Sequence, residues 1–156
     1  LFNDGWSLKV FGTDISRQVV KLAQNALYSN AGLSSFRSFP KQFYPYFEQQ
    51  QRGKDRLYNG EYDTFKVKES IRSLVYFDRH NLNTNDLPLF LKNMDVIFCR
   101  NMMIYIDQPS QKIIQNKFAQ ALSPKGYLVM SVVDTMHEPK LFSDVRMGTN
   151  MIHQRR

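Results

Sequence analysis

Polar side chains that could bind a ligand or a reacting group follow a short apolar segment in the second half of the chain. Arg100 and Asn101 come directly after residues 96–99 (Val-Ile-Phe-Cys), and Tyr105 lies shortly beyond them. The apolar segment is too short for a typical helix and rich in β-branched and aromatic residues, which predicts a strand buried on both faces of a parallel sheet. In open α/β sheets, ligands bind just beyond the carboxyl ends of strands. Arg100, Asn101 and Tyr105 are therefore candidate site residues, although Arg100 and Asn101 could instead close the strand and begin a solvated loop.

An acidic side chain follows a second predicted strand near the beginning of the chain. Residues 8–13 (Leu-Lys-Val-Phe-Gly-Thr) predict a strand that ends at Asp14, and Ser16 is a suitable N-cap for a helix over the apolar-periodic residues that follow. A strand, an acidic residue and a helix form the second half of a nucleotide-binding βαβ unit, where the carboxylate accepts hydrogen bonds from the ribose hydroxyls. Asp14 could instead only help to cap the helix.

These segments resemble those of a known enzyme family. Residues 99–107 (Cys-Arg-Asn-Met-Met-Ile-Tyr-Ile-Asp) closely resemble a segment of the chemotaxis receptor methyltransferases, the CheR family, which use S-adenosylmethionine to methylate glutamate side chains of chemoreceptors. Residues 10–16 (Val-Phe-Gly-Thr-Asp-Ile-Ser) resemble the family's second cofactor motif. Asn81-Leu82 matches an Asn-Leu pair that lies near the adenine in the family. The resemblance covers nearly the whole chain.

The resemblance implies an α/β fold with a Rossmann-like class I methyltransferase sheet, mostly parallel and flanked by helices. Residues 1–156 would form the C-terminal portion of that domain, with a small antiparallel β insertion at about residues 48–77. The family's first strand and its Gly-containing loop should precede residue 1, and that strand is normally central, so we expect an incomplete sheet. The chain also begins without a methionine, which is typical of a piece of a longer protein. Val132-Val133-Asp134-Thr135 stands where the family usually has a His-Ser-Glu phrase.

The resemblance also implies site residues and a cofactor. S-adenosylmethionine would be the methyl donor and S-adenosylhomocysteine the product. Tyr105 is the one catalytic candidate, as a group that positions the substrate near the reacting methyl. No strong base is needed, because a glutamate with a pKa of about 4.3 is already ionised near pH 7. The implied cofactor-binding residues are Asp14, Ile15, Asn81, Leu82, Arg100 and Asn101.

Composition limits the compartment and the partners. A hydrophobic fraction of 42% and a charged fraction of 22% are typical of a soluble globular domain, and no segment resembles a membrane span or a signal peptide, so we expect a cytoplasmic protein. The single cysteine, Cys99, excludes an internal disulfide, and we assign no metal site. The net charge of +7 favours acidic partners, either nucleic acid or an acidic protein surface.

The partner prediction favours protein over nucleic acid. Lys and Arg are scattered, and no helix-turn-helix or RNA-binding signature accompanies them, so we expect neither nucleic acid binding nor membrane insertion. The resemblance implies the cytoplasmic helices of chemoreceptors as partners and, as in some family members, a receptor-tail peptide that adds a strand to the β insertion. A degenerate, non-catalytic domain that senses S-adenosylmethionine or serves for docking is the alternative. A basic nucleic-acid-binding domain on a Rossmann-like fold is a second one, and its affinity would fall steeply with salt.

The remaining patterns predict further elements. The aromatic residues between positions 28 and 62 are expected to form a satellite core rather than a platform for bases, because no basic residues are interleaved with them. Residues 65–68 and 71–77 are expected to be strands. Asp107 is a candidate N-cap, with Pro109 in the first turn of a helix. Residues 127–133 predict a strand, and residues 142–153 could supply a final one. The expected buried stripe of the helix is Ile113, Ile114, Phe118, Ala121 and Leu122.

Overall fold

The computed structural model describes residues 5–30, 36, 39–55, 60–84, 86–148 and 150–156. The chain divides into two compact units, Leu1–His80 and Asn81–Arg156, and each is described by itself. None of the helices in the described ranges is long and apolar enough to cross a membrane.

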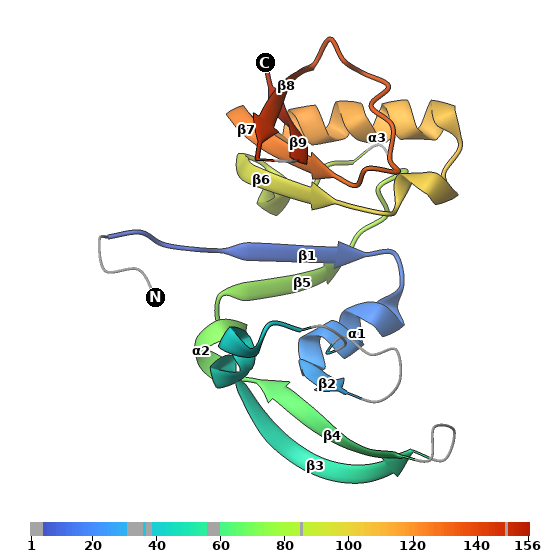
Figure 1. Cartoon of the computed structure of the whole chain (residues 1–156). Helices are drawn as coiled ribbons and strands as arrows, with labels where there is room; N and C mark the ends of the chain where they lie inside the picture. Colours follow the sequence, from blue (N-terminus) through green and yellow to red (C-terminus); the bar gives the residue numbers. More distant parts are fainter. Residues whose placement is uncertain (1–4, 31–35, 37–38, 56–59, 85, 149) are drawn as a thin grey trace. The chain divides into compact units, whose positions relative to one another are not determined.

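The first unit contains a parallel pair of strands with a helix between them in sequence. β1 (Val10–Asp14) pairs in parallel with β5 (Val75–Arg79), and α1 (Arg17–Asn25) follows β1 (Figure 1). The hydroxyl of Ser16 accepts a hydrogen bond from the backbone N–H of Val19 (3.4 Å), so the predicted N-cap is confirmed. The helix is tied to β5 by the side chain of Gln24, whose Nε2 donates to the carbonyl of Phe77 (3.1 Å).

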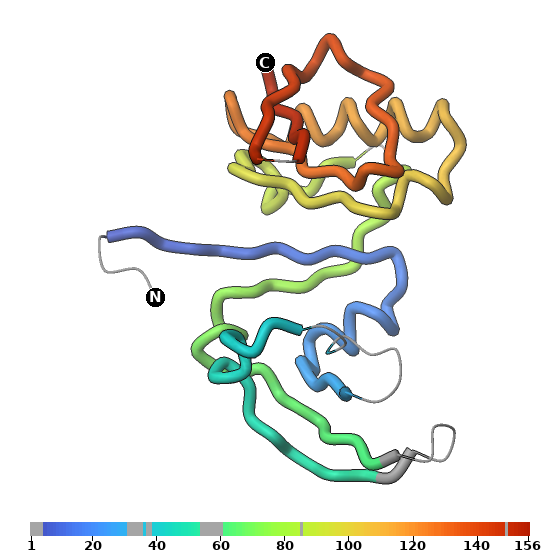
Figure 2. Tube along the Cα trace, viewed as in Figure 1, coloured from blue at the N-terminus to red at the C-terminus, as the bar shows by residue number. Residues whose placement is uncertain are grey.

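A second sheet of the first unit is fully antiparallel. β2 (Leu27–Ser29), β3 (Phe47–Asp55) and β4 (Gly60–Val67) are arranged in the order β2-β4-β3. Figure 2 shows β3 and β4 running side by side as a long hairpin, and their register shifts between Gln49 and Arg52. The sequence placed a strand at residues 71–77, which is wrong in its first part, because α2 (Glu69–Arg72) forms there and β5 begins only at Val75.

The aromatic residues beside this sheet pack on one another, as predicted. Phe36 is buried, with 7% of its surface exposed, and its ring lies 4.7 Å from that of Phe65 on β4 and 5.1 Å from that of Phe47 on β3. A 3₁₀ helix, η1 (Lys41–Tyr46), supplies Tyr44 to the same cluster. The cluster therefore serves as a local core of the antiparallel sheet.

The second unit is a mixed sheet with one long helix. β6 (Met94–Cys99) pairs in parallel with β7 (Leu122–Met130), and the hairpin of β8 (Phe142–Met147) and β9 (Asn150–Arg155) extends the sheet in the order β6-β7-β9-β8. The final strand expected in the tail is thus a hairpin. Short 3₁₀ turns, η2 (Leu89–Leu91) and η3 (Met103–Tyr105), precede and follow β6. The connection between β6 and β7 contains α3 (Gln108–Ala121) (Figure 1).

α3 begins as predicted, but one of its faces differs from the prediction. The carboxylate of Asp107 accepts hydrogen bonds from the N–H and the hydroxyl of Ser110 (3.0 and 2.9 Å), which lowers the pKa of that carboxyl. Ile113 is 47% exposed, so its place in the buried stripe is wrong. Two polar residues, Gln115 and Lys117, are buried instead. Ile114, Phe118, Ala121 and Leu122 are buried as expected.

β6 is buried on one face only within its unit. Cys99 packs into a core with residues of α3 and β7, including Ile114, Phe118 and Leu128. Val96 and Phe98 point to the opposite face and are 43% and 74% exposed, so burial on both faces is not observed. The reason is that α3 covers a single face of this sheet.

In the described residues β1 pairs with β5 and β6 with β7, so each of β1 and β6 has one edge without a paired strand.

Candidate functional site

Asp14 lies at the carboxyl end of β1, partly buried, at the junction with α1. Its Oδ1 accepts a hydrogen bond from the backbone N–H of Ser16 (2.7 Å), so the carboxylate does help to shape the start of the helix. An ionised carboxylate has about four acceptor sites, and this one bond does not use them all. The second oxygen is chemically suited to accept the two hydroxyls of a ribose. Both interpretations of Asp14 are therefore compatible with its geometry.

The backbone beside Asp14 is held by the neighbouring strand. Arg79 is the register partner of Asp14 on β5, and its Nε donates to the carbonyl of Ile15 (2.9 Å). The N–H of His80 donates to the carbonyl of Asp14 (3.0 Å). Ile15 is 56% exposed and presents an apolar surface next to the carboxylate. An acceptor beside an apolar wall is what a nucleoside requires.

In the second unit, the chain turns sharply where β6 ends. Asn101 has a backbone φ of 57°, in the left-handed region that Asn tolerates better than most residues. Its N–H donates to Oδ2 of Asp134 (2.9 Å). Arg100 is exposed immediately before this turn. The η3 turn follows and buries Met103, which is 1% exposed, while Tyr105 is 84% exposed.

α3 holds the same turn from behind. Nε2 of Gln111 donates to the carbonyls of Met103 (3.0 Å) and Ile106 (2.7 Å), which lie on either side of Tyr105 in sequence. The N–H of Tyr105 itself donates to the carbonyl of Met102 (3.2 Å). The hydroxyl-bearing side chain is thus displayed from a backbone with fixed hydrogen bonds.

The segment after β7 is anchored by two side chains. Oδ2 of Asp134 accepts from the N–H of Ser131 (3.0 Å). Gln115 is fully buried; its Nε2 donates to the carbonyl of Thr135 (2.8 Å), and its Oε1 accepts from the N–H groups of His137 and Glu138 (2.8 and 3.1 Å).

Burial and the nearby charge of Asp134 raise the pKa of the Cys99 thiol to about 12. Cys99 is therefore an inert core residue near pH 7.

Asn81 and Leu82 begin the second unit. Oδ1 of Asn81 accepts from the N–H of Asn83 (3.0 Å), which forms a compact turn. The buried amine of Lys117 on α3 donates to the carbonyl of Leu82 (2.8 Å), and burial lowers the pKa of this lysine. The Leu82 side chain packs against the core of the unit. A short apolar and amide-bearing segment is thereby fixed to α3.

The structure gathers the predicted residues into groups within each unit. Asp14 and Ile15 share the carboxyl end of β1, and the segment that follows β6 contains Arg100, Asn101 and Tyr105. The sequence reading assigned no role to the supporting residues Arg79, Gln111, Gln115 and Asp134. Gln111 and Gln115 carried no local signal, because their contacts with backbone groups exist only in the folded chain.

Comparison with known proteins decides the family. Residues 2–151 match the family model described as "CheR methyltransferase, SAM binding domain". The chain belongs to this family. It is 32% identical over 135 residues to the chemotaxis protein methyltransferase of Borreliella burgdorferi, 28% identical over 130 residues to that of Vibrio parahaemolyticus, and 32% identical over 121 residues to that of Escherichia coli.

The matches cover most of this chain but less than half of the relatives. The aligned segments are 86%, 83% and 77% of this chain, and 43%, 42% and 38% of the Borreliella, Vibrio and Escherichia proteins, respectively. The resemblance read from residues 99–107 is thereby confirmed, as is the Rossmann-like class of the fold, with its parallel strands and antiparallel additions. S-adenosylmethionine is the cofactor that the family's description names.

Proposed function

We propose that this chain is the cofactor-binding part of a protein-glutamate O-methyltransferase that forms methyl esters on the cytoplasmic helices of chemoreceptors. The observation that carries the proposal is the hydrogen-bonded turn after β6. It displays Tyr105, 84% exposed, from hydrogen-bonded backbone at the carboxyl end of a parallel strand. The named relatives, all chemotaxis protein methyltransferases, support the reaction class.

The Asp14 carboxylate fits the ribose of S-adenosylmethionine. One of its oxygens is used by Ser16, and the ion retains acceptor capacity for ribose hydroxyls beside the exposed Ile15. From the family resemblance we also assign Asn81 and Leu82 to the adenine, and Arg100 and Asn101 to cofactor binding. When bound, S-adenosylmethionine supplies a methyl group activated by a positively charged sulfur.

The chain's own task is to orient the acceptor. A glutamate side chain is already ionised at neutral pH, since its pKa is about 4.3, and a direct displacement needs alignment rather than a base. The Tyr105 hydroxyl can donate a hydrogen bond to one oxygen of the acceptor carboxylate and leave the other free to attack. An exposed Arg100 adds positive charge near the same turn, which favours a carboxylate.

The test is transfer of a labelled methyl group by the complete protein to chemoreceptor cytoplasmic fragments. We expect label that is released by mild alkali, as from a methyl ester, and we expect Tyr105→Phe to lower kcat by about tenfold or more, because the positioning hydrogen bond is lost. The affinity for S-adenosylhomocysteine should stay within about threefold of the parent value. A protein that binds S-adenosylhomocysteine but transfers no methyl group to any receptor fragment would support the sensing or docking alternative instead.

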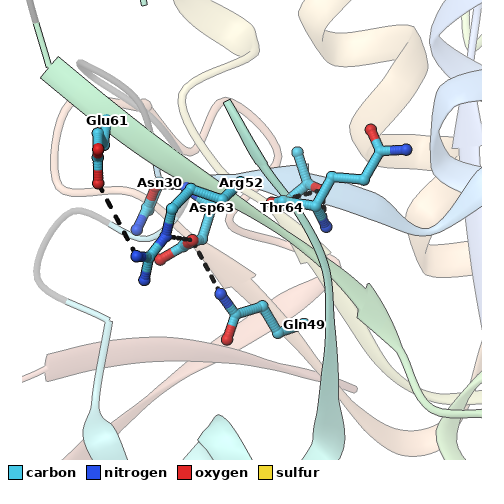
Figure 3. A network of polar contacts seen from close by, with 7 residues as sticks. Asn30, Gln49, Arg52, Glu61, Asp63 and Thr64 are labelled. Carbon is cyan, nitrogen blue, oxygen red and sulfur yellow. Dashed lines mark hydrogen bonds and ion pairs between the residues drawn. The ribbon is translucent and has the colours of Figure 1, made fainter. Parts of the chain in front are cut away.

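We further propose that the antiparallel sheet binds a receptor-tail peptide by strand addition at β3. This strand is at the end of the order β2-β4-β3, so its outer edge has no paired strand among the described residues. Asp63 on β4 accepts from Gln49 (2.8 Å) and Arg52 (3.2 Å) on β3, and its N–H donates to Asn30 (2.7 Å) (Figure 3). The ion pair with Asp63 raises the pKa of Arg52. These contacts hold β3 in place across its register shift.

A backbone-modified peptide tests strand addition without changing the protein. We expect a peptide from the receptor's C-terminus to bind in calorimetry, and N-methylation of its strand-facing alternate amides to weaken binding by about tenfold or more, since main-chain hydrogen bonds supply affinity in this mode. The same peptide methylated on the other alternate amides is the control and should bind within about threefold of the parent. Equal sensitivity to both sets, or no binding, would contradict the proposal.

A further inference from the structure

The turn after β6 is clamped at its first residue. Oδ2 of Asp134 accepts from the N–H of Asn101 at 2.9 Å and from the N–H of Ser131 at 3.0 Å. One carboxylate oxygen thus bridges the end of β6 and the end of β7. Because Asn101 is in the left-handed region, its backbone sets the direction in which residues 102–106 leave the sheet. Hydrogen bonds to a charged acceptor are among the stronger ones in proteins.

The same turn is clamped at its far end by α3. Nε2 of Gln111 donates to the carbonyls of Met103 and Ile106, and both bonds span the position of Tyr105. The Met103 side chain, 1% exposed, is the apolar anchor beneath them. Gln111 therefore helps to fix the backbone from which the Tyr105 side chain leaves, without a described hydrogen bond to that side chain.

The side chains of Gln111 and Asp134 each bury a polar atom at a cost in free energy, and neither helix nor sheet formation requires this burial. Oε1 of Gln111 and Oδ1 of Asp134 are buried atoms without a hydrogen-bond partner in the described part of the chain. Buried polar atoms without a partner are uncommon, and functional sites are among the places where proteins retain them. α3 already has its N-cap in Asp107, so Gln111 is not needed to start the helix.

We propose that Gln111 and Asp134 are positioning residues, which act through the backbone of residues 101–106 to place the Tyr105 hydroxyl against the acceptor carboxylate. The inference rests on the proposed function, because it assigns the turn a role in methyl transfer. Asp134 belongs to the segment Val132-Val133-Asp134-Thr135, which differs from the family's usual His-Ser-Glu phrase but also contains a carboxylate. The inference gives this carboxylate a role.

The experiment uses the complete protein and two pairs of variants. Gln111→Glu replaces the donor amide by a carboxylate of the same shape, which two carbonyl oxygens repel, and Asn116→Ala is its control on the same helix. Asp134→Ala removes the bridging acceptor, whereas Asp134→Asn keeps an amide oxygen that can accept both N–H groups. We expect Gln111→Glu and Asp134→Ala to lower kcat by about tenfold or more, with S-adenosylhomocysteine affinity within about threefold of the parent, and both controls to stay within about threefold.

A double-mutant cycle separates positioning from general loss of structure. If the clamps act through Tyr105, adding Gln111→Glu to Tyr105→Phe should cost less than about threefold more in kcat, because the group being positioned is already gone. Fully multiplied losses in the double variant would overturn the inference. So would a kcat loss in Asp134→Asn as large as that in Asp134→Ala.

Hydrogen exchange in the protein without bound cofactor tests the inference separately from the proposed function. We expect hydrogen exchange at the Tyr105 amide in Gln111→Glu, and at the Asn101 amide in Asp134→Ala, to be about tenfold faster or more than in the parent, while the amides of the β7 strand are unaffected. Unchanged exchange at both amides would overturn the inference even if the enzyme is active. If the variants exchange faster but the parent protein transfers no methyl group, the clamp remains supported and only the proposed reaction is removed.

Discussion

Replacing Asp14 with alanine is expected to weaken the binding of S-adenosylhomocysteine by about a hundredfold or more. A carboxylate that accepts both ribose hydroxyls makes two charge-assisted hydrogen bonds, each worth about 1.5–3 kcal/mol. A loss of about 3 kcal/mol corresponds to about a hundredfold in the dissociation constant. Calorimetric titration of the complete protein with S-adenosylhomocysteine measures this directly.

The control for Asp14→Ala is chosen from the hydrogen bond that Asp14 already makes. Its Oδ1 accepts from the N–H of Ser16, and the Ser16 hydroxyl caps α1. Ser16→Ala removes that cap but no acceptor for ribose, so we expect its affinity to stay within about threefold of the parent, although α1 loses stability. If Asp14→Ala binds as tightly as Ser16→Ala, the carboxylate serves only the helix start, and the ribose must be held elsewhere.

Local sequence signals predicted the starts of α1 and α3. Ser16 and Asp107 both accept hydrogen bonds from N–H groups in the first turns of their helices, as their residue types and positions indicated. The reason is that capping depends on a few adjacent residues and very little on the rest of the fold. The strands that end at Asp14 and at Cys99 were predicted for a similar reason, because a polar residue closes the first and directly follows the second.

Features that depend on distant contacts could not be predicted in this way. Phe98 belongs to an apolar run, and nothing local reveals that only one face of β6 is covered by a helix in its unit, which leaves Phe98 74% exposed. Likewise Gln115 is indistinguishable by composition from an exposed helical glutamine. It is buried because the segment from Thr135 to Glu138, far along the chain, needs partners for three backbone groups.

The residues of the candidate site also differ in how far the sequence predicts them. The side chains that would face a ligand, such as Asp14 and Tyr105, are recognisable because their type and motif are informative by themselves. The side chains that fix them are not, since a bond from Gln111 to two carbonyls, or from Asp134 to two strand ends, exists only after the fold has formed. Supporting residues therefore have to come from the structure, and they are where a family resemblance is least informative.

Gln115→Leu is expected to destabilise the second unit strongly, although it nearly keeps the side-chain volume. Gln115 is fully buried and satisfies the carbonyl of Thr135 and the N–H groups of His137 and Glu138. Leucine fills similar space but leaves these three backbone groups without partners. Since an unsatisfied buried polar group costs about 1–3 kcal/mol, and water can reach part of this segment, we expect a loss of about 2–4 kcal/mol in the free energy of unfolding.

Urea or thermal unfolding of the complete protein, followed beside hydrogen exchange at His137 and Glu138, measures this loss. The matched control is Asn116→Ala, on the next position of α3, because the hydrogen bond of the Asn116 side chain among the described residues stays within its own helix, to the carbonyl of Lys112. We expect the control to change stability by about 0.5 kcal/mol or less. If Gln115→Leu is equally mild and the amides of His137 and Glu138 stay protected, the segment after β7 is held by its own backbone turn rather than by α3. Asp134 would then be its principal tether, and the clamp on Asn101 would depend on that single carboxylate.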